Sequence, residues 1–415
     1  MPSSREPSGL TTVDEHLANI LKRISALPTY QQPLMDALGL PVAEDIHSPV
    51  ALPIFDNSAM DGYAVVFRDV ADASAERPVH LPVVGEIAAG QTRIFAMSPG
   101  TAVRIMTGAP IPQGCDAVVP FEWTDEGVAQ VLIHRAPGLG EHVRRAGEEI
   151  SKGDLLMPKG TMVGARQLGL LASVGFGQVP TPPRPRVVVL STGSELVDPG
   201  SPLGRDSIFD ANSYLLAAAA KSAGAIAYRV ASVSDDPDSF SEAINDQLVR
   251  ADVVVTSGGV SKGTHDVVKE VLRELGTVDF LEVAMQPGKP QGFGVIGEDA
   301  TPIFTLPGNP VSSYISFEVF VVPALRKMMG REPYARPLVR ASCTTDLTSM
   351  RGRRQFLRAQ IAAGPGGAKV TPVGGAGSHL VAGLSGANAL IVIAEDITRV
   401  EAGQPVPVMM LDREF

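Results

Sequence analysis

Apolar residues near the start of the chain recur at helical intervals, at Val13, Leu17, Ile20, Leu21 and Ile24. Thr12 and Glu15 have the spacing of a capping box, in which each side chain accepts a hydrogen bond from the backbone N–H of the other residue. The pattern predicts a helix from about Val13 to Leu27, ended by Pro28. A short second helical stretch is expected around Leu34 to Leu38.

Between residues 79 and 133 the helical pattern gives way to short β-prone runs separated by Gly and Pro turns. The runs are VHLPVV, TAVRIM, DAVVPF and VAQVLIH. Valine and isoleucine dominate them, and such β-branched residues are typical of strands. The pattern predicts a small β domain, inserted after the turn-rich and oxygen-rich segment SPVALPIFDNSAMDGYAV.

Strand and helix patterns alternate beyond the proline-rich segment 181–186, which predicts a domain boundary. The expected strands are RVVVLS, AIAYRVASV, ADVVVTSGG, VDFLEV and IFTLPG. The expected helices are NSYLLAAAAKSAG, DSFSEAINDQLV, HDVVKEVLREL and NPVSSYISFEVFVVPALRKMM. This alternation is typical of a parallel α/β sheet. After residues 331–337, strands and glycine turns predict a C-terminal β domain.

Composition and charge exclude several classes of function. Hydrophobic residues make up 44% and charged residues 19% of the 415, the balance of a folded protein. A formal charge of −10 provides no global field for nucleic acid, so no such partner is expected. Cys115 and Cys343 are far apart, which favours a reducing cytoplasm. The first ten residues lack the apolar core of a signal peptide, and prolines interrupt the uncharged run 300–317, so no membrane association is expected.

Three loops follow strands of the predicted α/β sheet and combine small residues with hydroxyl groups. They span residues 191–196 (STGSEL), 256–261 (TSGGVS) and 306–312 (LPGNPVS). Ligands bind at the carboxyl ends of parallel strands, and free backbone amides at such loops suit a phosphate or another oxyanion. The alternative is that the glycines only form tight turns, although three such loops in one sheet favour a site. Walker and dinucleotide-binding motifs are absent.

Carboxylates form a second pattern, because Asp56, Asp61, Glu195, Asp235, Asp236 and Asp266 all lie in turn-rich segments. Hard oxygen ligands of this kind suit Mg²⁺ bound beside substrate phosphates. For the Asp-Asp-Pro segment at 235–237, a helix N-cap is an equally good interpretation, and both roles can coexist. The histidines lack zinc-site spacing, and no G-x-S-x-G elbow is present.

Nine motifs in order give the sequence a resemblance that covers nearly the whole chain. They are DNSAMDGYA (56–64), RIMTGAP (104–110), VRRAGEEI (143–150), LSTGSEL (190–196), DDP (235–237), TSGGVSKGTHD (256–266), PGKP (287–290), LPGNPVS (306–312) and GSHL (377–380). The sequence resembles the molybdopterin molybdenumtransferase family, which includes the C-terminal domain of gephyrin. The long DNSAMDGYA segment makes chance similarity of glycine loops an insufficient explanation.

The resemblance implies an enzyme that inserts molybdenum from molybdate into adenylated molybdopterin and releases AMP, with Mg²⁺ as cofactor. It also implies a homodimer, with possible contacts to the adenylyltransferase partner and to recipient molybdoenzymes. The implied fold class is multidomain α/β plus β, with a parallel molybdopterin-binding-type α/β domain at its centre. The implied domains are a discontinuous first domain (1–48 and 149–182), an inserted β domain (49–148), the α/β domain (183–331) and a C-terminal β domain (332–415).

Functional residues carry over from the resemblance position by position. Those implied to be catalytic are Asp56, Asp61, Thr107 and Glu195. Those implied to bind substrate are Ser257, Gly258, Gly259, Ser261, Lys289, Pro307, Pro310, Arg353 and Ser378. Those implied to bind the metal and the adenylate are Glu195, Asp235 and Asp266. Asp56 would be an acid-base or orienting carboxylate that reaches the α/β pocket of the other subunit. The alternative for Arg353 is a solvated basic strand face.

Three positions depart from the family pattern. Glu282 and Gln286 stand where the family usually has lysines, and Glu149 stands where it has aspartate. A carboxylate in place of an ammonium group reverses the sign of its interaction with an anion, so Lys262 and Lys289 become candidate substitutes. The departures motivate a second hypothesis, a non-catalytic carrier or scaffold that binds molybdopterin or the finished cofactor. A third, the adenylyltransferase itself, is disfavoured by the flanking domains.

Overall fold

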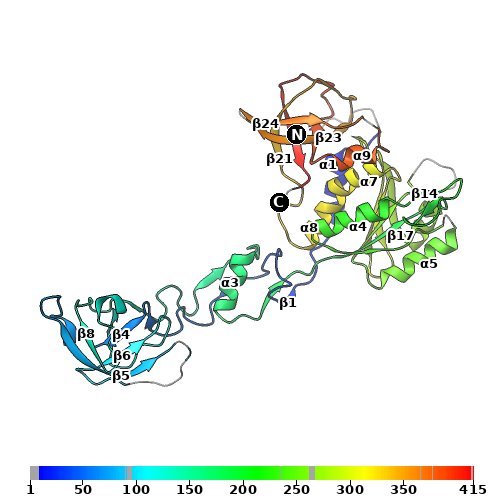
Figure 1. The fold of residues 1–415 in the computed structure, drawn as a ribbon. Helices are drawn as coiled ribbons and strands as arrows, with labels where there is room; N and C mark the ends of the chain where they lie inside the picture. Colours follow the sequence, from blue (N-terminus) through cyan, green and yellow to red (C-terminus); the bar gives the residue numbers. More distant parts are fainter. Residues whose placement is uncertain are drawn as a thin grey trace, which may run out of the picture. The chain divides into compact units, whose positions relative to one another are not determined.

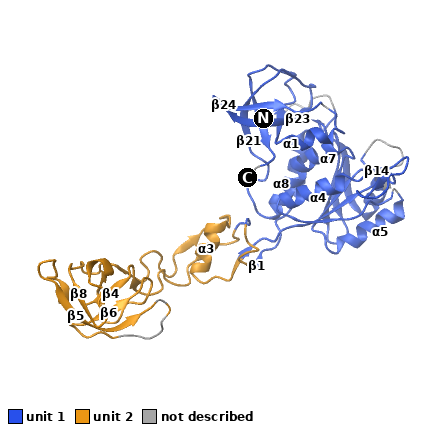
Figure 2. Cartoon of the chain, in the orientation of Figure 1, with its two compact units in different colours: residues 1–31, 39–41, 180–415 blue, residues 32–38, 42–179 orange. Residues whose placement is uncertain are grey.

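The computed structural model of the chain describes residues 9–88, 90, 96–234, 236–260, 267–364, 366–375, 377–412 and 415. The chain forms two compact units (Figure 2). Unit 1 comprises residues 1–31, 39–41 and 180–415, and unit 2 comprises residues 32–38 and 42–179. The predicted domain boundaries divide the chain more finely than these two units and stay a prediction.

Unit 2 contains a five-stranded sheet in the order β7-β4-β6-β5-β8. Its strands are β4 (Gly62–Val65), β5 (Val79–Ile87), β6 (Ala102–Ile105), β7 (Ala117–Pro120) and β8 (Gln130–Ile133). Side chains from these strands fill a core around the fully buried Tyr63. The strands expected between residues 79 and 133 are therefore confirmed.

The rest of unit 2 consists of short elements. They are β2 (Ile46–His47) paired with β10 (Leu155–Met157), β3 (Asn57–Ser58) paired with β9 (Val143–Arg144), α2 (Phe67–Val70), the single turn η1 (Phe121–Trp123) and α3 (Ala165–Ser173). The prediction of a helix around Leu34 to Leu38 is wrong, because residues 34–39 form turns. β1 (Tyr30–Pro33) pairs with β11 (Gln178–Thr181) and ends at Pro33, while Gly39 has a φ of +75°, so too few residues remain for a helix to nucleate.

Unit 1 is built on a six-stranded sheet in the order β15-β12-β16-β20-β19-β17. Its strands are β12 (Arg186–Ser191), β15 (Ile226–Arg229), β16 (Val253–Ser257), β17 (Gly276–Glu282), β19 (Pro290–Ile296) and β20 (Thr301–Leu306). The first four in sheet order are parallel, whereas β19 is antiparallel to both of its neighbours. The sheet is therefore mixed rather than purely parallel, and β19 was not among the expected strands.

Helices cover both faces of this sheet (Figure 1). They are α4 (Asn212–Ser222), α5 (Pro237–Leu248), α6 (Val267–Leu275), α7 (Pro310–Ser316) and α8 (Val322–Met328). Val187 and Val189 pack in the core with α4, α7 and α8, while Val188 and Leu190 pack with α5 and α6. A strand buried on both faces explains the continuous apolar run VVVL at 187–190. Phe317–Val321 widens into a π-helix, so the single helix expected over 309–329 has three parts.

The C-terminal part of unit 1 is a second six-stranded sheet in the order β18-β23-β24-β21-β27-β25. Its strands are β18 (Met285–Gln286), β21 (Leu338–Cys343), β23 (Arg354–Gly364), β24 (Gly367–Pro372), β25 (Ala389–Ile393) and β27 (Pro405–Met410). Further short elements are the paired strands β13 (Leu196–Val197) and β14 (Ile208–Phe209), the paired strands β22 (Leu347–Thr348) and β26 (Arg399–Val400), and α9 (Val381–Ser385).

Among the described residues, no helix is long and apolar enough to cross a bilayer.

The first helix, α1 (Val13–Arg23), has the predicted capping box, with Glu15 N–H donating to Thr12 Oγ1 at 3.1 Å. It ends at Arg23, four residues before the expected end, because Ile24 takes an extended conformation. His16 on this helix is 2% exposed and its ring meets that of Phe320 edge-on, with 4.7 Å between the ring centroids. The Nδ1 atom of His16 has no hydrogen-bond partner among the described residues.

Burial of His16 makes the stability of unit 1 dependent on pH. Burial lowers the pKa of His16 from 6.5 to about 4, so the unfolded chain binds a proton more readily than the folded one. The free energy of unfolding therefore has its full value above pH 6.5. It decreases as the pH falls from 6.5 towards 4, by ~3 kcal/mol in total. Hydrogen exchange of α1 peptides across this range measures the loss. His16→Leu should flatten the pH dependence, whereas His80→Gln, at an exposed histidine, should leave it unchanged.

Candidate active site

The loops after β12, β16 and β20 meet at one end of the six-stranded α/β sheet and enclose a pocket of about 430 Å³. Residues of all three predicted loops line it, together with the segment between β14 and α4. The predicted site residues among the lining are Glu195, Ser257, Gly258, Gly259 and Pro310. The structure thus brings together, in unit 1, predicted site residues that are up to 115 positions apart in the sequence, from Glu195 to Pro310.

Two glycines after β16 bring the backbone close to neighbouring groups. Gly258 has a φ of +107°, and a Cβ atom there would lie 2.7 Å from Thr192 Oγ1. Gly259 has a φ of +69°, and a Cβ atom there would lie 2.3 Å from a methyl group of Val268. Only glycine meets both conditions, so this bend leaves bare backbone at the pocket wall.

The Glu195 side chain lies over Gly193 at the pocket. A Cβ atom added to Gly193 would lie 2.7 Å from Glu195 Oε2. The residue is exposed, and within the described part of the chain its carboxylate has no ion-pair partner. Glu195 therefore presents a hard oxygen ligand to whatever occupies the pocket.

Asn212, at the start of α4, connects two of the loops. Its Nδ2 atom donates to Ser257 Oγ at 2.7 Å and to the Gly308 carbonyl at 2.5 Å. Ser257 Oγ lies 3.3 Å from Ser313 Oγ, and Ser313 in turn donates to the Pro307 carbonyl. The predicted residues Ser257 and Pro307 therefore belong to one hydrogen-bonded network at the pocket floor.

Asp210 is a buried carboxylate of the pocket that no sequence motif identifies. It is 1% exposed and accepts hydrogen bonds from Ser191 Oγ at 2.9 Å, Ser213 N–H at 3.0 Å and Ser213 Oγ at 2.5 Å. These bonds hold the end of β12 against the start of α4. The only sequence signal was the Asp-Ala-Asn-Ser segment at the predicted start of a helix, which is typical of a cap.

The predicted residue Ser378 lies at the start of α7, although it comes from the C-terminal part of the chain. Asn309 Nδ2 donates to Ser378 Oγ at 3.0 Å, and Val311 N–H donates to the Ser378 carbonyl at 3.1 Å. The next residue, His379, lines the pocket beside Asn309 and Pro310. The segment 377–380 is therefore part of the pocket rim.

Lys289 and Arg353 contact the two residues that replace the family's lysines. Lys289 Nζ lies 2.7 Å from Glu282 Oε2. Arg353 Nη1 donates to Gln286 Oε1 at 3.2 Å. Lys289 lines a different cavity, of about 680 Å³, together with Val260. The Lys289 ammonium is thus balanced by a carboxylate, which weakens it as a substitute cation for an anionic substrate.

The two predicted carboxylates of unit 2 are each held by hydrogen bonds. Asp56 accepts from Ala146 N–H at 2.8 Å and from Arg145 Nη1 at 2.6 Å, which lowers the pKa of its carboxyl group. Asp61 accepts from Thr107 N–H at 2.6 Å and from Thr107 Oγ1 at 2.8 Å, and the pKa of this carboxyl group is lowered too. Both groups are therefore ionised at neutral pH, and Asp61 and Thr107 form a direct pair.

Several predicted residues lie outside the described part of the chain. These are Asp235, Ser261, Lys262 and Asp266. Asp236 is described, and its side chain caps α5 by accepting from Ser239 N–H at 2.9 Å, so the N-cap interpretation of this segment is confirmed at Asp236. Within the described ranges, no three His, Cys, Asp or Glu side chains converge as metal ligands. The three-carboxylate metal set stays a prediction, because Glu195 is the only one of the three described.

Three family models match successive parts of the chain. Their descriptions are "MoeA N-terminal region (domain I and II)" over residues 11–175, "Probable molybdopterin binding domain" over 188–327 and "MoeA C-terminal region (domain IV)" over 340–411. Their order agrees with the predicted fold class, in which an α/β domain precedes a C-terminal β domain.

Similar proteins cover almost the full length. A Mycobacterium tuberculosis protein named molybdopterin molybdenumtransferase 2 is 44% identical over 96% of this chain and 99% of its own. A Nostoc protein named molybdopterin molybdenumtransferase is 36% identical over 99% of this chain and 94% of its own. The solved structure of a molybdopterin biosynthesis MoeA protein from Pyrococcus horikosii is 33% identical, covers 98% of this chain and 100% of its own, and gives a TM-score of 0.80. These matches, at full length and above 30% identity, show that the chain belongs to the molybdopterin molybdenumtransferase family, as its motifs predict.

Proposed function

We propose that the protein inserts molybdenum from molybdate into the dithiolene of adenylated molybdopterin and releases AMP. The observation that carries this proposal is the 430 Å³ pocket in which three strand-to-helix loops present bare backbone, hydroxyl groups and the Glu195 carboxylate. Such a pocket suits a phosphate-bearing ligand. The names of the relatives supply the reaction class.

The pocket residues have distinct parts in this proposal. Gly258 and Gly259 allow a phosphate to approach the backbone closely, because no side chain covers them. Asn212 fixes the position of the Ser257 hydroxyl, which contacts the phosphate. Ser378 and Arg353, from the C-terminal part, bind oxygen atoms of the anionic substrates.

Glu195 fits a Mg²⁺ ion, because this ion is bound by one or two carboxylates together with substrate phosphates and water. Asp235 and Asp266 complete the ligand set in the proposal. When bound, Mg²⁺ would polarise the phosphoanhydride bond of the adenylate. Glu195 would hold the ion through its carboxylate, which keeps a negative charge at the pocket.

We also place the Asp56 carboxylate at the active site of a second copy, in a homodimer. Arg145 and Ala146 hold this carboxylate in its ionised form, ready to orient a reacting group or to accept a proton. Asp61 and Thr107 support the same segment.

The proposed location is the cytoplasm, because the two free cysteines stay reduced there. The expected partners are the adenylyltransferase and the recipient molybdoenzymes.

The second candidate is a carrier that binds the adenylate or the finished cofactor without turnover. The observation that favours it is the ion pair between Lys289 and Glu282, together with the neutral Gln286 beside Arg353. Glu282 and Gln286 carry no positive charge at positions where the family usually has lysines, and Glu282 also offsets the charge of Lys289. A site with fewer cations binds molybdate more weakly.

One assay separates the two candidates. The purified protein is incubated with adenylated molybdopterin, molybdate and Mg²⁺, and AMP release is measured together with activation of a cofactor-free molybdoenzyme. Molybdate-dependent AMP release with activation supports the transferase, and tight binding of the adenylate without turnover rejects it in favour of the carrier. Asp56→Asn is the informative variant, because it should abolish product formation and leave adenylate binding nearly unchanged.

A further inference from the structure

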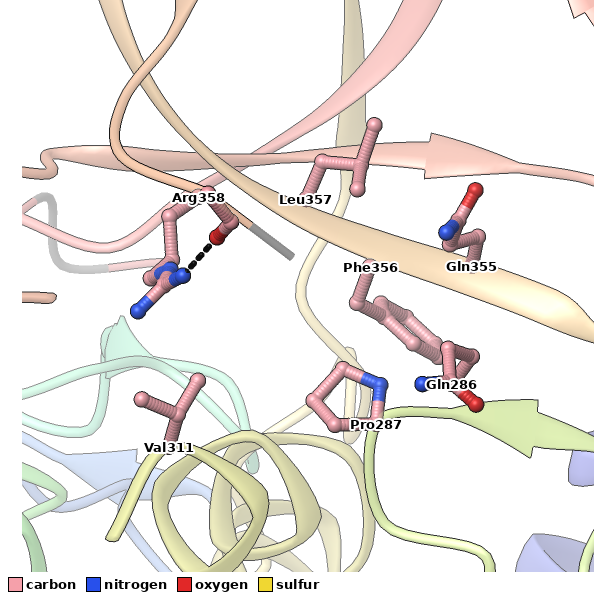
Figure 3. A pocket seen from close by; sticks show the side chains of 8 residues that line it. Gln286, Pro287, Val311, Gln355, Phe356, Leu357 and Arg358 are labelled. Atoms are coloured by element: carbon pink, nitrogen blue, oxygen red, sulfur yellow. Dashed lines mark hydrogen bonds between the residues drawn. The ribbon is translucent and has the colours of Figure 1, made fainter. Parts of the chain in front are cut away.

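Two stretches of chain form side walls of the candidate active site. One is the rim at 377–380, which meets α7 at Val311, and Val311 also lines a small cavity with Pro287 (Figure 3). The other is the segment 195–210, which leaves the sheet after β12 and returns before α4. This segment carries Glu195 at its start and Asp210 at its end, so the contacts that hold it also set the positions of both carboxylates.

The 195–210 segment has little regular structure of its own. Its paired strands, β13 and β14, have two residues each and are joined in parallel, Leu196 to Ile208 and Val197 to Phe209. The side chains of Ile208 and Phe209 are exposed, so the segment buries little apolar surface. Two strands of this length are not stable by themselves, so the segment depends on contacts with the rest of the fold.

Asp210 fixes one end of the segment. Its N–H donates to the Val197 carbonyl at 2.9 Å, and its carboxylate accepts from the N–H and the hydroxyl of Ser213, at the start of α4. The Ile208 N–H donates to the Glu195 carbonyl, also at 2.9 Å. The strand β14 is thus fixed to α4, and the residues around β13 are bonded to β14.

Arg229, the last residue of β15, holds the other side of β13. Its Nη1 atom donates to Asp198 Oδ1 at 2.8 Å, and its Nη2 atom donates to Asp198 Oδ2 at 3.5 Å, so the guanidinium fork faces the carboxylate. Within the described ranges, this is the only ion pair of the 195–210 segment. Ser232, three residues after Arg229, adds a hydrogen bond from its Oγ atom to the Leu196 carbonyl at 3.3 Å.

The Arg229 guanidinium group is itself held in place. Its Cζ atom lies 4.2 Å from the centroid of the Tyr214 ring, and Nη1 lies 3.5 Å from Ser213 Oγ, which donates to Asp210. The hydrogen bond to Asp198 raises the pKa of this group, and the charge of Asp210 adds to the effect. Arg229 is therefore a fixed positive charge between a carboxylate in the segment and the buried carboxylate at its end.

We infer that Arg229 is a positioning residue, whose guanidinium group binds Asp198 and thereby holds β13 and Glu195 at the wall of the active-site pocket. The consequence for activity rests on the proposed function, whereas the contact itself does not. Residues that orient a ligand-binding side chain from outside the site typically contribute about 10- to 100-fold to affinity or activity.

The test combines hydrogen exchange with kinetics on the full chain. In Arg229→Gln, the hydrogen-bonded amides of Leu196, Ile208 and Asp210 should exchange at least about tenfold faster, because loss of one hydrogen bond to a charged group can change a local opening by that factor. Peptides from β16 and α7 should exchange as in the wild type. The kcat/KM of molybdate-dependent AMP release should fall about 10- to 100-fold.

The matched control is Arg186→Gln, at the opposite end of the same sheet. Arg186 begins β12 and makes a similar two-bond ion pair, from Nε to Asp252 Oδ2 at 3.1 Å and from Nη2 to Asp252 Oδ1 at 2.8 Å. Its loss should leave AMP release and the exchange of the three amides unchanged. An equal rise in exchange in both variants would mean that any lost ion pair loosens the segment, and would overturn the inference.

Further variants test whether Arg229 acts through Asp198. Asp198→Asn, at a side chain that is 41% exposed, should reproduce the faster exchange, and it serves if Arg229→Gln does not fold. Adding Asp198→Asn to Arg229→Gln should change the exchange little further, because both substitutions remove one contact. Arg229→Lys keeps the charge without the fork, so its exchange should lie between those of the wild type and Arg229→Gln.

Three results would overturn the inference. The first is wild-type exchange of the three amides in both Arg229→Gln and Asp198→Asn. The second is a rise in exchange spread over the whole α/β sheet, which would indicate general destabilisation. The third is full additivity in the double variant, because Asp198 would then not be the partner through which Arg229 acts. If the wild type itself releases no AMP, the proposed function fails, while the exchange data still test the contact between Arg229 and Asp198.

Discussion

Replacing Glu195 by glutamine is expected to lower molybdate-dependent AMP release by more than about 100-fold, because a lost carboxylate ligand should cost more than a lost outer-shell partner. The substitution keeps the size of the side chain and removes its charge at the pocket, where the carboxylate lies over Gly193. AMP release measured over a range of Mg²⁺ concentrations checks this. The concentration of Mg²⁺ needed for half-maximal rate should also rise.

A matched control for Glu195 is Glu298→Gln, at an exposed glutamate in the turn after β19. It removes the same charge from the same unit and should leave both the rate and the Mg²⁺ requirement unchanged. If Glu195→Gln keeps the wild-type rate at limiting Mg²⁺, Glu195 is not a metal ligand. The binding of the adenylate would then have to rest on the backbone and hydroxyl groups of the pocket.

Gly62→Ala should destabilise unit 2 by at least about 3 kcal/mol, the upper end for overpacking, because the clash is with backbone. Gly62 belongs to the DNSAMDGYA motif and lies in β4 opposite Pro120 of β7. A Cβ atom there would lie 2.0 Å from the Val119 carbonyl oxygen, so the two strands would have to separate. Urea unfolding followed by fluorescence of Trp123, the single tryptophan of the chain, reports on this sheet.

The control for Gly62 lies in the same unit. Gly169 is in α3, and a Cβ atom there would have no neighbour within 4 Å. Gly169→Ala should leave the unfolding midpoint unchanged or raise it, by up to ~1 kcal/mol in free energy, because alanine favours the helix. A Gly62→Ala protein with the wild-type midpoint would show that the sheet can shift to accept the methyl group, and would leave the motif's glycine without a structural reason.

The sequence predicts the elements of the α/β sheet well where burial is complete. The run from Val187 to Leu190 is apolar throughout because helices cover both faces of β12, and no other structure suits so short a run. The prediction from sequence fails at β19, because its Gly292 and Gly294 look like turn residues. In the structure, a Cβ atom at Gly294 would lie 2.1 Å from the Thr277 carbonyl oxygen, so this glycine serves close strand approach.

The candidate site, like the sheet, could be predicted from the sequence only in part. The glycine loops could be predicted because local backbone geometry requires glycine at Gly258 and Gly259. Asp210 and Asn212 could not, because their roles depend on partners that only the fold brings near. Among the four arginines of the segment 351–358, only the resemblance points to Arg353 as a site residue.

The strand β18 comes from residues 285 and 286, yet it pairs in parallel with β23 of the C-terminal sheet. Arg354 N–H also donates to the Ala284 carbonyl at 2.8 Å. A fragment cut out at residue 332 would therefore lose a strand, and the start of β23 would become an open edge able to pair with other chains. We expect such a truncated fragment to aggregate unless residues 284–286 are supplied, so the last segment of the sequence does not make a self-sufficient folding unit.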